Sequence, residues 1–391
     1  MSDKKLEFSI NEDEQQVLDL VHEIGRNEII PQRMELDEKE EFPHKIFDKF
    51  REAGLFGTLF DEAYGGLGMG PFMSCLVMEA ISQYCLGVAT SFGAVKLGAL
   101  PILFGGTEEQ KQKYILPLST GEKLAAFALT EPEAGSDVPN LSTTAVKKGD
   151  KYVLNGTKQW ISNGGAADIY TVFALTDKSK GARGMSVFVV EKDTPGLSFG
   201  KLENKLGIRC SHTRQVILED VEVPEENLVG LKPNKGFIHG LKTLNASRPF
   251  IAAMGVGVAQ GAYQEAAKYA RERVQFGKNI INFQAIQHML ANMIVKIEGA
   301  RLLTYRAAVY SDGSHPGTAK FSAIAKYYSS EIAMQVTTDA IQILGGYGYT
   351  KDYPVEKMFR DAKILQIYEG TSQIQLNEIG AHIIKESATF K

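Results

Sequence analysis

Cysteine and histidine are scarce in this chain, and their scarcity excludes several kinds of chemistry. The three cysteines, Cys75, Cys85 and Cys210, are odd in number and form no CxxC pair. The seven histidines form no HxxxH or HExxH pair, and no GxSxG stretch is present. A disulfide framework, a structural zinc site and a serine-nucleophile elbow are therefore not expected. We predict that the cysteines are small core residues and that the chain binds no metal.

Basic clusters and long apolar runs are also missing. The net charge is −4, and no Lys/Arg cluster suggests a nucleic-acid surface. No uninterrupted apolar run reaches membrane-spanning length. The N-terminal stretch "MSDKKLEFSINEDEQQ" is too acidic and polar for a leader peptide. We expect no membrane span, no nucleic-acid partner and a cytoplasmic location.

What the chain does have is three regions with different hydrophobic periods. Its 391 residues, 44% of them hydrophobic, are enough for two or three domains. Residues 1–120 carry apolar residues at helical spacing, and residues 121–230 change to β-branched runs such as "DIYTVFAL". Residues 231–391 return to long helical stretches that suit a four-helix bundle. The predicted class is mainly α, with a β domain between two helical domains.

Local signals predict where some elements begin and end. Asn11 and Glu14 suit a capping box, and Pro31 is expected to end the first helix. Asn155 and Gly156 inside "KYVLNGTKQW" predict a hairpin turn. The stretch "MGVGVAQG" superficially resembles a dinucleotide fingerprint, but helical sequence lies on both sides of it. Close helix packing is the favoured interpretation of its glycines.

Four motifs could bind a ligand, and each has an ordinary structural alternative. "LTEPEAGSD" (129–137) offers hydroxyl and backbone N–H groups, or is a domain connector. Trp160, with Ser162 facing the same side of a strand end, could stack on a flat ring or lie in the core. Arg273, in "RERVQFGK", could clamp a phosphate or complement a helix dipole. "ILGGYGY" (343–349) could approach a phosphate or simply stop a helix.

Taken in order, these motifs are similar to those of one family. Over nearly the whole chain the sequence resembles the acyl-CoA dehydrogenases, through "LTEPEAGSD", "NGTKQWISNG", "NKLGIRCSHTRQVILEDVEVP", "RERVQFGK", "QILGGYGYT" and "IYEGTSQIQ". The resemblance implies FAD as cofactor, an acyl-CoA thioester as substrate, an electron-transferring flavoprotein as partner and a homotetramer. It also implies an N-terminal helical domain, a middle β-barrel domain and a C-terminal four-helix bundle, in agreement with the periods above.

The resemblance further implies roles for particular residues. Glu369 matches the base that takes the α proton of the thioester. The positions that match flavin contacts are Phe127, Leu129, Thr130, Ser136, Trp160 and Ser162. The positions that match contacts to the adenine-dinucleotide part, some of them reached from a neighbouring subunit, are Arg273, Phe276, Gln342, Gly346, Thr371 and Gln373. The positions expected near the substrate are Ser136, Asn245, Arg248, Tyr368 and Gly370.

The implied reaction explains why a carboxylate stands in apolar surroundings at Glu369. It removes a proton from the α carbon of the thioester and a hydride from the β carbon. Water exclusion by the acyl chain should raise the pKa of the carboxyl toward neutrality, which suits a general base.

The acyl group is less well defined by the sequence. The stretch "GVATSFGAVKLGALP" should line the acyl pocket, and glutaryl-specific members of the family carry an arginine where this chain has Val88. A dicarboxylate is therefore disfavoured, and Lys96 is expected on a solvated helix face. The small residues of this stretch leave room in the pocket; they are Gly87, Ala89, Gly93, Ala94 and Gly98.

A short- or medium-chain acyl group is favoured, with an alicyclic or branched acyl group as the alternative. Asn245 stands where straight-chain members often have aspartate, which leaves the finer substrate contacts open. Two further classes also stay open, namely a flavin oxidase on the same fold and a non-catalytic acyl-CoA-binding scaffold.

Overall fold

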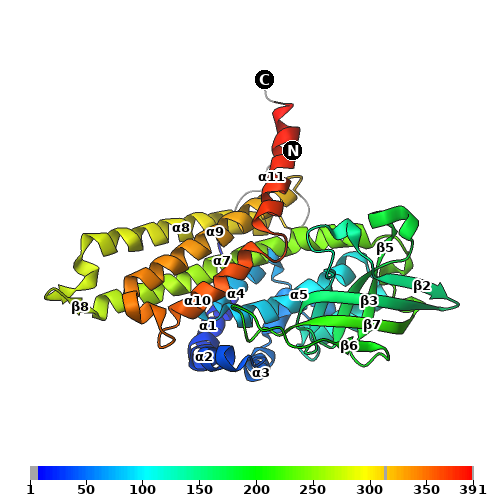
Figure 1. Ribbon diagram of the computed structural model, residues 1–391, viewed down its shortest axis with the longest axis horizontal. Coiled ribbons are helices and arrows are strands. Elements are labelled where there is room, and N and C mark those ends of the chain that lie inside the picture. The colour runs from blue at the N-terminus through cyan, green and yellow to red at the C-terminus, as the bar shows by residue number, and fades with distance from the viewer. Residues whose placement is uncertain (1–7, 312–314, 390–391) are drawn as a thin grey trace.

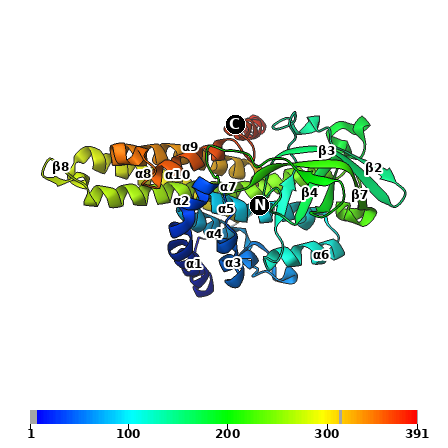
Figure 2. The ribbon, with the colours of Figure 1, turned by 60° about the horizontal axis from the view of Figure 1, so that its bottom comes forward.

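The chain is mainly helical, with a β-sheet region between two helical regions. The computed structural model describes residues 8–311 and 315–389. In Figure 1 the long C-terminal helices and the sheet lie end to end, and the last helix projects from the body. Figure 2 shows N-terminal helices lying to one side of the long C-terminal helices. The predicted helical, β, helical order is confirmed. Residues 1–7, which belong to the N-terminal stretch predicted not to be a leader peptide, lie outside the described residues.

The N-terminal region begins with the capping box that its sequence predicts. Asn11 Oδ1 accepts from the N–H of Glu14 at 2.9 Å, and Glu14 Oε2 accepts from the N–H of Asn11 at 2.9 Å. The prediction that Pro31 ends the first helix is wrong. The chain stays helical through a π turn at Gly25–Ile29, and Pro31 lies in the first turn of the next helix, where a missing N–H is tolerated. The helices are α1 (Glu12–Ile24), α2 (Ile30–Lys39), α3 (His44–Glu52), α4 (Gly70–Tyr84), α5 (Leu86–Gly105) and α6 (Glu108–Ser119).

The middle region is a curled seven-stranded sheet. Its strands run in the order β1, β4, β2, β3, β7, β6, and β5 pairs with β4. Every residue of β4 is buried, as expected of a strand covered on both faces. The strands are β1 (Ala125–Ala128), β2 (Thr144–Lys148), β3 (Lys151–Ser162), β4 (Ile169–Leu175), β5 (Met185–Glu191), β6 (Leu197–Phe199) and β7 (Thr213–Pro224).

The predicted hairpin turn at Asn155 and Gly156 is wrong. Strand β3 continues through both residues, and its register with β7 shifts between Leu154 and Gly156. Asn155 instead exchanges two hydrogen bonds with Asp220 on β7, of 2.9 and 3.0 Å. The dipeptide therefore marks a bulge, which uses the same backbone freedom as a tight turn.

The C-terminal region is built on three long helices that run alongside one another (Figure 1). A Cβ atom on Gly257 would lie 2.2 Å from the carbonyl oxygen of Glu79, and one on Gly261 would lie 2.2 Å from that of Gln83. These glycines therefore allow α7 to pack closely on α4, as predicted for "MGVGVAQG". The elements are α7 (Gly236–Glu272), β8 (Val274–Gln275), β9 (Lys278–Asn279), α8 (Gln284–Val309), α9 (Thr318–Leu344), α10 (Val355–Ala362) and α11 (Ser372–Ser387).

Helix α5 lies between the helical regions and the sheet, and it corrects the expectation for Lys96. Within the described residues it is the one helix long and apolar enough to cross a membrane, although most of it is buried inside the protein, as in a core helix. Its one charged residue, Lys96, is not on a solvated face. The ammonium donates to the carbonyl of Leu59 and lies 4.7 Å from the ring centre of Phe60. Burial lowers the pKa of Lys96 to about 8.

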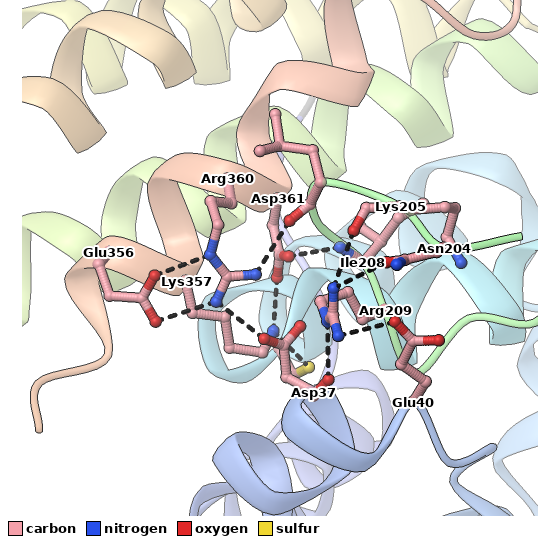
Figure 3. Close-up of polar contacts among 12 residues, drawn as sticks. Asp37, Glu40, Asn204, Lys205, Ile208, Arg209, Glu356, Lys357, Arg360 and Asp361 are labelled. Carbon is pink, nitrogen blue, oxygen red and sulfur yellow. Dashed lines mark hydrogen bonds and ion pairs between the residues drawn. The ribbon is translucent and has the colours of Figure 1, made fainter. Parts of the chain in front are cut away.

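A buried polar network joins the three regions (Figure 3). Arg360 on α10 donates to Asp37 on α2 at 2.8 Å. Its neighbour Asp361 accepts from the backbone N–H of Ile208 at 2.5 Å and from Lys357 at 2.5 Å. Removing one partner of such a buried pair leaves an uncompensated charge, so the network fixes how the regions meet.

The cysteines are buried and free, which confirms their predicted place in the core. Cys85 also accepts a hydrogen bond from the Lys357 ammonium at 3.3 Å and so lies at the edge of this polar network. Over residues 8–311 and 315–389, no group of three or more His, Cys, Asp or Glu side chains could hold a metal ion.

Candidate active site

Glu369 lies in a strained turn just before helix α11. Its φ is +52°, and that of Gly370 is +91°. Glycine adopts this left-handed region freely, whereas a glutamate rarely does. A non-glycine residue held there costs on the order of 1–3 kcal/mol and persists only where its surroundings fix it. The surroundings of this turn therefore define the candidate site.

Three side chains from two long helices surround the Glu369 carboxylate. The hydroxyl of Ser247, on α7, donates to Glu369 Oε2. Lys326, on α9, and Arg248, on α7, act on the carboxylate through their charges. Burial raises the pKa of Glu369 above its ordinary value, while the Ser247 hydrogen bond and the two cations offset part of that rise. A buried carboxyl with a raised pKa is suited to act as a general base.

Arg248 has donors that the protein does not use. It is buried, its Nη1 donates to Asn245 Oδ1 at 2.9 Å, and its Nε has no partner among the described residues. Burial lowers the pKa of this guanidinium. A buried arginine with a free donor has capacity for an oxygen of a ligand.

Tyr368 lies against helix α5, beside methionine side chains. Its hydroxyl donates to Met254 Sδ at 3.5 Å. A Cβ atom on Gly93 of α5 would lie 2.8 Å from Met254 Cε and 2.9 Å from Met78 Cε. The two methionines therefore cover Gly93 of α5 and limit the space beyond Tyr368. Of the five positions expected near the substrate, the structure thus places Asn245, Arg248, Tyr368 and Gly370 near Glu369, and Ser136 lies on the exposed "LTEPEAGSD" loop.

A second group of predicted residues lies where strands β1 and β3 meet. The N–H of Gln159 donates to the carbonyl of Thr130 at 2.8 Å, and the Lys158 ammonium donates to that of Leu129 at 3.1 Å. These bonds bring the start of the "LTEPEAGSD" loop next to Trp160. Phe127 and Ser162 are half-buried on the same two strands, and Ser136 is exposed on the loop.

Trp160 is not a core residue. Its side chain is 59% exposed, and its backbone has φ +60°. A large exposed indole beside hydroxyl groups offers a flat apolar surface with polar groups at its edge. These residues therefore fit a flat heteroaromatic ring such as that of a flavin.

A third group lies at the far end of the long helices from the sheet (Figure 1). A pocket of about 520 Å³ is lined there by Arg273 and Gly346, among others. The Arg273 guanidinium lies 5.5 Å from the ring centre of Tyr347. Gln342 is exposed, and Phe276, on the turn between β8 and β9, is 94% exposed. Within one chain these residues are not brought to Trp160, as expected if they serve a neighbouring subunit.

Two predicted residues of α11 stay close to Glu369 without touching its carboxylate. Thr371 caps the helix, its Oγ1 accepting from the N–H of Ile374 at 3.2 Å. Gln373 is exposed on the first turn.

Sequence reasoning missed three residues that contact the Glu369 turn: Ser247, Lys326 and Gln375. Ser247 directly precedes Arg248 in "NASRP", so its neighbour was a usable signal. Lys326 is a single charge in "SAIAKYYSS", a pattern that indicates a buried lysine. Gln375 closes "IYEGTSQIQ" and had no signal of its own.

Comparison with known proteins agrees with this geometry. Three family models match in order: acyl-CoA dehydrogenase N-terminal domain at residues 11–122, middle domain at 126–221 and C-terminal domain at 234–384. The short-chain-specific acyl-CoA dehydrogenase of Clostridium acetobutylicum is 45% identical over 97% of this chain and all of that protein. The cyclohex-1-ene-1-carbonyl-CoA dehydrogenase of Geobacter metallireducens is 44% identical over 93% of this chain and 96% of that protein.

A solved structure agrees as well. A chain in the structure described as the electron transferring flavoprotein of Acidaminococcus fermentans is 46% identical to this one, with a TM-score of 0.94 over 97% of this chain and 99% of that chain. The resemblance predicted from the motifs is confirmed, and the chain belongs to the acyl-CoA dehydrogenase family.

Proposed function

We propose that this enzyme oxidises a short-chain acyl-CoA to its 2-enoyl-CoA, with Glu369 as the base that removes the α proton. The observation that carries the proposal is a carboxylate fixed in a left-handed turn, with a raised pKa, between Ser247, Arg248 and Lys326. Acyl-CoA dehydrogenases use FAD, which supplies the acceptor for the β hydride when it is bound. The protein's own contribution is to position the base, exclude water and stabilise the enolate.

The structure supports particular tasks for the other residues. Arg248 offers its unused Nε to an oxygen of the substrate, and Gly370, next to the base in the chain, is proposed to lie beside the thioester. Trp160 presents its exposed face to the flavin ring. The remaining flavin contacts are proposed for Phe127, Leu129, Thr130, Ser136 and Ser162, and those to the adenine-dinucleotide part for Arg273, Phe276, Gln342, Gly346, Thr371 and Gln373.

A short acyl chain is favoured by the two methionines that lie against Gly93 of α5. An acyl group that extends from Glu369 past Tyr368 reaches Met254 and Met78 where Gly93 faces them. The short-chain relative supports the same size. Methionine side chains are flexible and could shift to admit a ring, and a relative acts on a cyclohexene acyl group. An alicyclic acyl-CoA is therefore the second candidate.

We further propose that the electrons pass to an electron-transferring flavoprotein and that the enzyme is a cytoplasmic homotetramer. The similarity to a chain in a structure described by that flavoprotein's name supports the first part. In one chain β8, which directly follows Arg273, and β3, which carries Trp160, lie at opposite ends of the molecule (Figure 1), and this supports an assembly that completes the flavin site. The domains proposed are residues 1–120, 121–230 and 231–391.

The test is anaerobic bleaching of the purified yellow enzyme by straight, branched and cyclic acyl-CoAs. Butyryl-CoA should bleach the flavin fastest, and Glu369→Gln should keep FAD but lose bleaching by at least about a hundredfold. A colourless protein that does not take up FAD would support a scaffold instead. Fast reoxidation in air without a protein acceptor would support an oxidase.

A further inference from the structure

We propose that Lys326 and Gln375 are positioning residues that hold the Glu369–Gly370 turn in the form that presents the base. This inference rests on the proposed function of Glu369. Neither residue is among the contacts that the family motifs predict. Both side chains are buried. Lys326, on α9, precedes the turn in the sequence, and Gln375, in the first turn of α11, follows it.

The two side chains hold both carbonyl groups of the strained dipeptide. Lys326 Nζ donates to the carbonyl of Gly370 at 2.6 Å. Gln375 Nε2 donates to the carbonyl of Gly370 at 2.9 Å and to that of Glu369 at 3.2 Å. A turn with two consecutive positive φ values relaxes unless its peptide groups are fixed. These three hydrogen bonds supply that constraint.

Close packing against the Gln375 side chain leaves the Glu369–Gly370 turn little freedom to move. A Cβ atom on Gly370 would lie 2.6 Å from Gln375 Nε2, so the amide lies directly against the backbone. The same peptide groups set the direction of the Glu369 side chain and of its backbone N–H. A small rotation of this turn would therefore move the base relative to the α carbon, and such misplacement is costly in rate.

Lys326 carries a charge that a purely structural role does not require. It is fully buried, yet it forms no ion pair within the described part of the chain; a backbone carbonyl is the acceptor of its ammonium. A neutral donor would bind that carbonyl with a smaller desolvation cost. The charge has a use because Glu369 lies close enough to interact with it. A nearby cation stabilises the ionised carboxylate, which is the form that takes a proton.

The charged groups around Lys326 come from each element packed on it. Arg248 on α7 opposes its charge, and Glu331 on α9 and Glu369 in the turn favour it. Burial outweighs these effects and lowers the pKa of Lys326 to about 7. The ammonium and the base are therefore expected to titrate as an interacting pair.

The test compares three variants of the FAD-loaded enzyme. Lys326→Met removes the charge and the hydrogen bond, and Gln375→Leu removes only neutral hydrogen bonds. Ser330→Ala is the matched control, because Ser330 is buried on the same helix and donates to Leu365, ahead of the turn, at 2.9 Å. FAD content and melting temperature of each variant are measured first.

The rate of proton removal by Glu369 is then measured in a reaction that does not reduce the flavin. Acetyl-CoA has α hydrogens but no β carbon, so exchange of its methyl hydrogens in deuterated buffer, followed by mass spectrometry, reports proton removal alone. We expect Lys326→Met to slow exchange at least about tenfold and to shift the acid limb of its pH profile upward, because the carboxylate loses a stabilising cation. Gln375→Leu should slow exchange without that shift, and Ser330→Ala should match the wild type.

The inference fails if Lys326→Met and Ser330→Ala exchange at the same rate with the same pH profile. If Lys326→Met does not fold, Lys326→Gln keeps a donor for Gly370 and isolates the charge; an unshifted profile in that variant overturns the electrostatic role. A wild-type enzyme that neither exchanges acetyl-CoA nor bleaches with any acyl-CoA would instead contradict the proposed function.

Discussion

The ion pair Glu131–Lys158 offers a sharp test of what holds the proposed flavin shelf in place. By shelf we mean Leu129, Thr130 and Trp160, which lie where β1 and β3 meet. The Glu131 and Lys158 side chains are 3% and 0% exposed, and their charged atoms lie 2.7 Å apart. The pair joins the "LTEPEAGSD" loop to β3 directly below the shelf. We choose the change Glu131→Gln because it keeps the shape of the side chain and removes only the charge.

The expected magnitude follows from the contacts of the pair. The Glu131 carboxylate accepts from the Lys158 ammonium, from the N–H and hydroxyl of Ser142 at 2.7 Å each and from the N–H of Thr143 at 3.0 Å. In Glu131→Gln, Lys158 stays buried with only neutral acceptors such as the Leu129 carbonyl. An unpaired buried charge costs roughly 3–5 kcal/mol, which at about 2 °C per kcal/mol lowers the melting temperature by about 6–10 °C.

The pH dependence of this loss has a definite sign. Burial alone would raise the pKa of Glu131, but the Lys158 ammonium and the hydrogen bonds from Thr143 and Ser142 outweigh it and lower the pKa to about 2. A depressed carboxyl pKa stabilises the fold above its ordinary value of 4.5 and loses that contribution as the pH falls toward 2. The difference in melting temperature between the wild type and Glu131→Gln should therefore become smaller as the pH is lowered.

The assay is thermal unfolding of the FAD-loaded enzyme, with flavin release followed by its fluorescence. Glu225→Gln is the control, because Glu225 pairs with Lys147 at 2.6 Å with both side chains almost half exposed, and such pairs contribute less than about 1 kcal/mol. The double variant Glu131→Gln, Lys158→Met removes both charges and should be more stable than Glu131→Gln alone. Equal melting of Glu131→Gln and Glu225→Gln would refute the reasoning.

Two further predictions concern the base and the core. Ser247→Ala removes a hydrogen bond that stabilises ionised Glu369, so the acid limb of the pH profile of kcat/KM should move to higher pH. The plateau value of kcat/KM should change less than about tenfold. An acid limb at the wild-type pH would contradict this prediction. Gly257→Val places a Cβ atom 2.2 Å from the carbonyl oxygen of Glu79 and should lower the free energy of unfolding, measured in urea, by about 3 kcal/mol or more. The control is Gly380→Ala, whose Cβ atom meets no atom within 4 Å and should not lower it. Similar urea midpoints for the two variants would refute the packing argument.

Local signals in the sequence were reliable where neighbours along the chain decide the structure. The capping box at Asn11 needs only Glu14, three residues away, and it is present. Pro31 and Gly156 do have the backbone properties that the predictions relied on, but Pro31 does not end a helix and Gly156 does not form a hairpin turn. Proline is compatible with the first turn of a helix as well as with its end, and glycine serves a bulge as well as a hairpin. Which one occurs depends on the partners, here α2 and β7.

Contacts between distant segments were not predictable in this way. Ser247 lies 122 positions from Glu369, and Lys326 lies 44 positions from Gly370, so only the packing of α7 and α9 against the turn brings them together. The predicted solvent exposure of Lys96 is wrong for the same reason. Its own helix has no side that reveals which face is covered, because α5 is apolar nearly all round.

The candidate site lies where separate regions of the chain meet, and this has a consequence for its control. The base and its neighbours Ser247 and Lys326 belong to the C-terminal region, whereas the Trp160 shelf belongs to the sheet. Proton removal and hydride acceptance must act on adjacent carbons of one substrate, so the two regions have to stay in register. The Asp361 hydrogen bond to Ile208, in Figure 3, joins these same regions shortly before Glu369 in the sequence. The buried network is therefore expected to set the distance between base and flavin, and not stability alone.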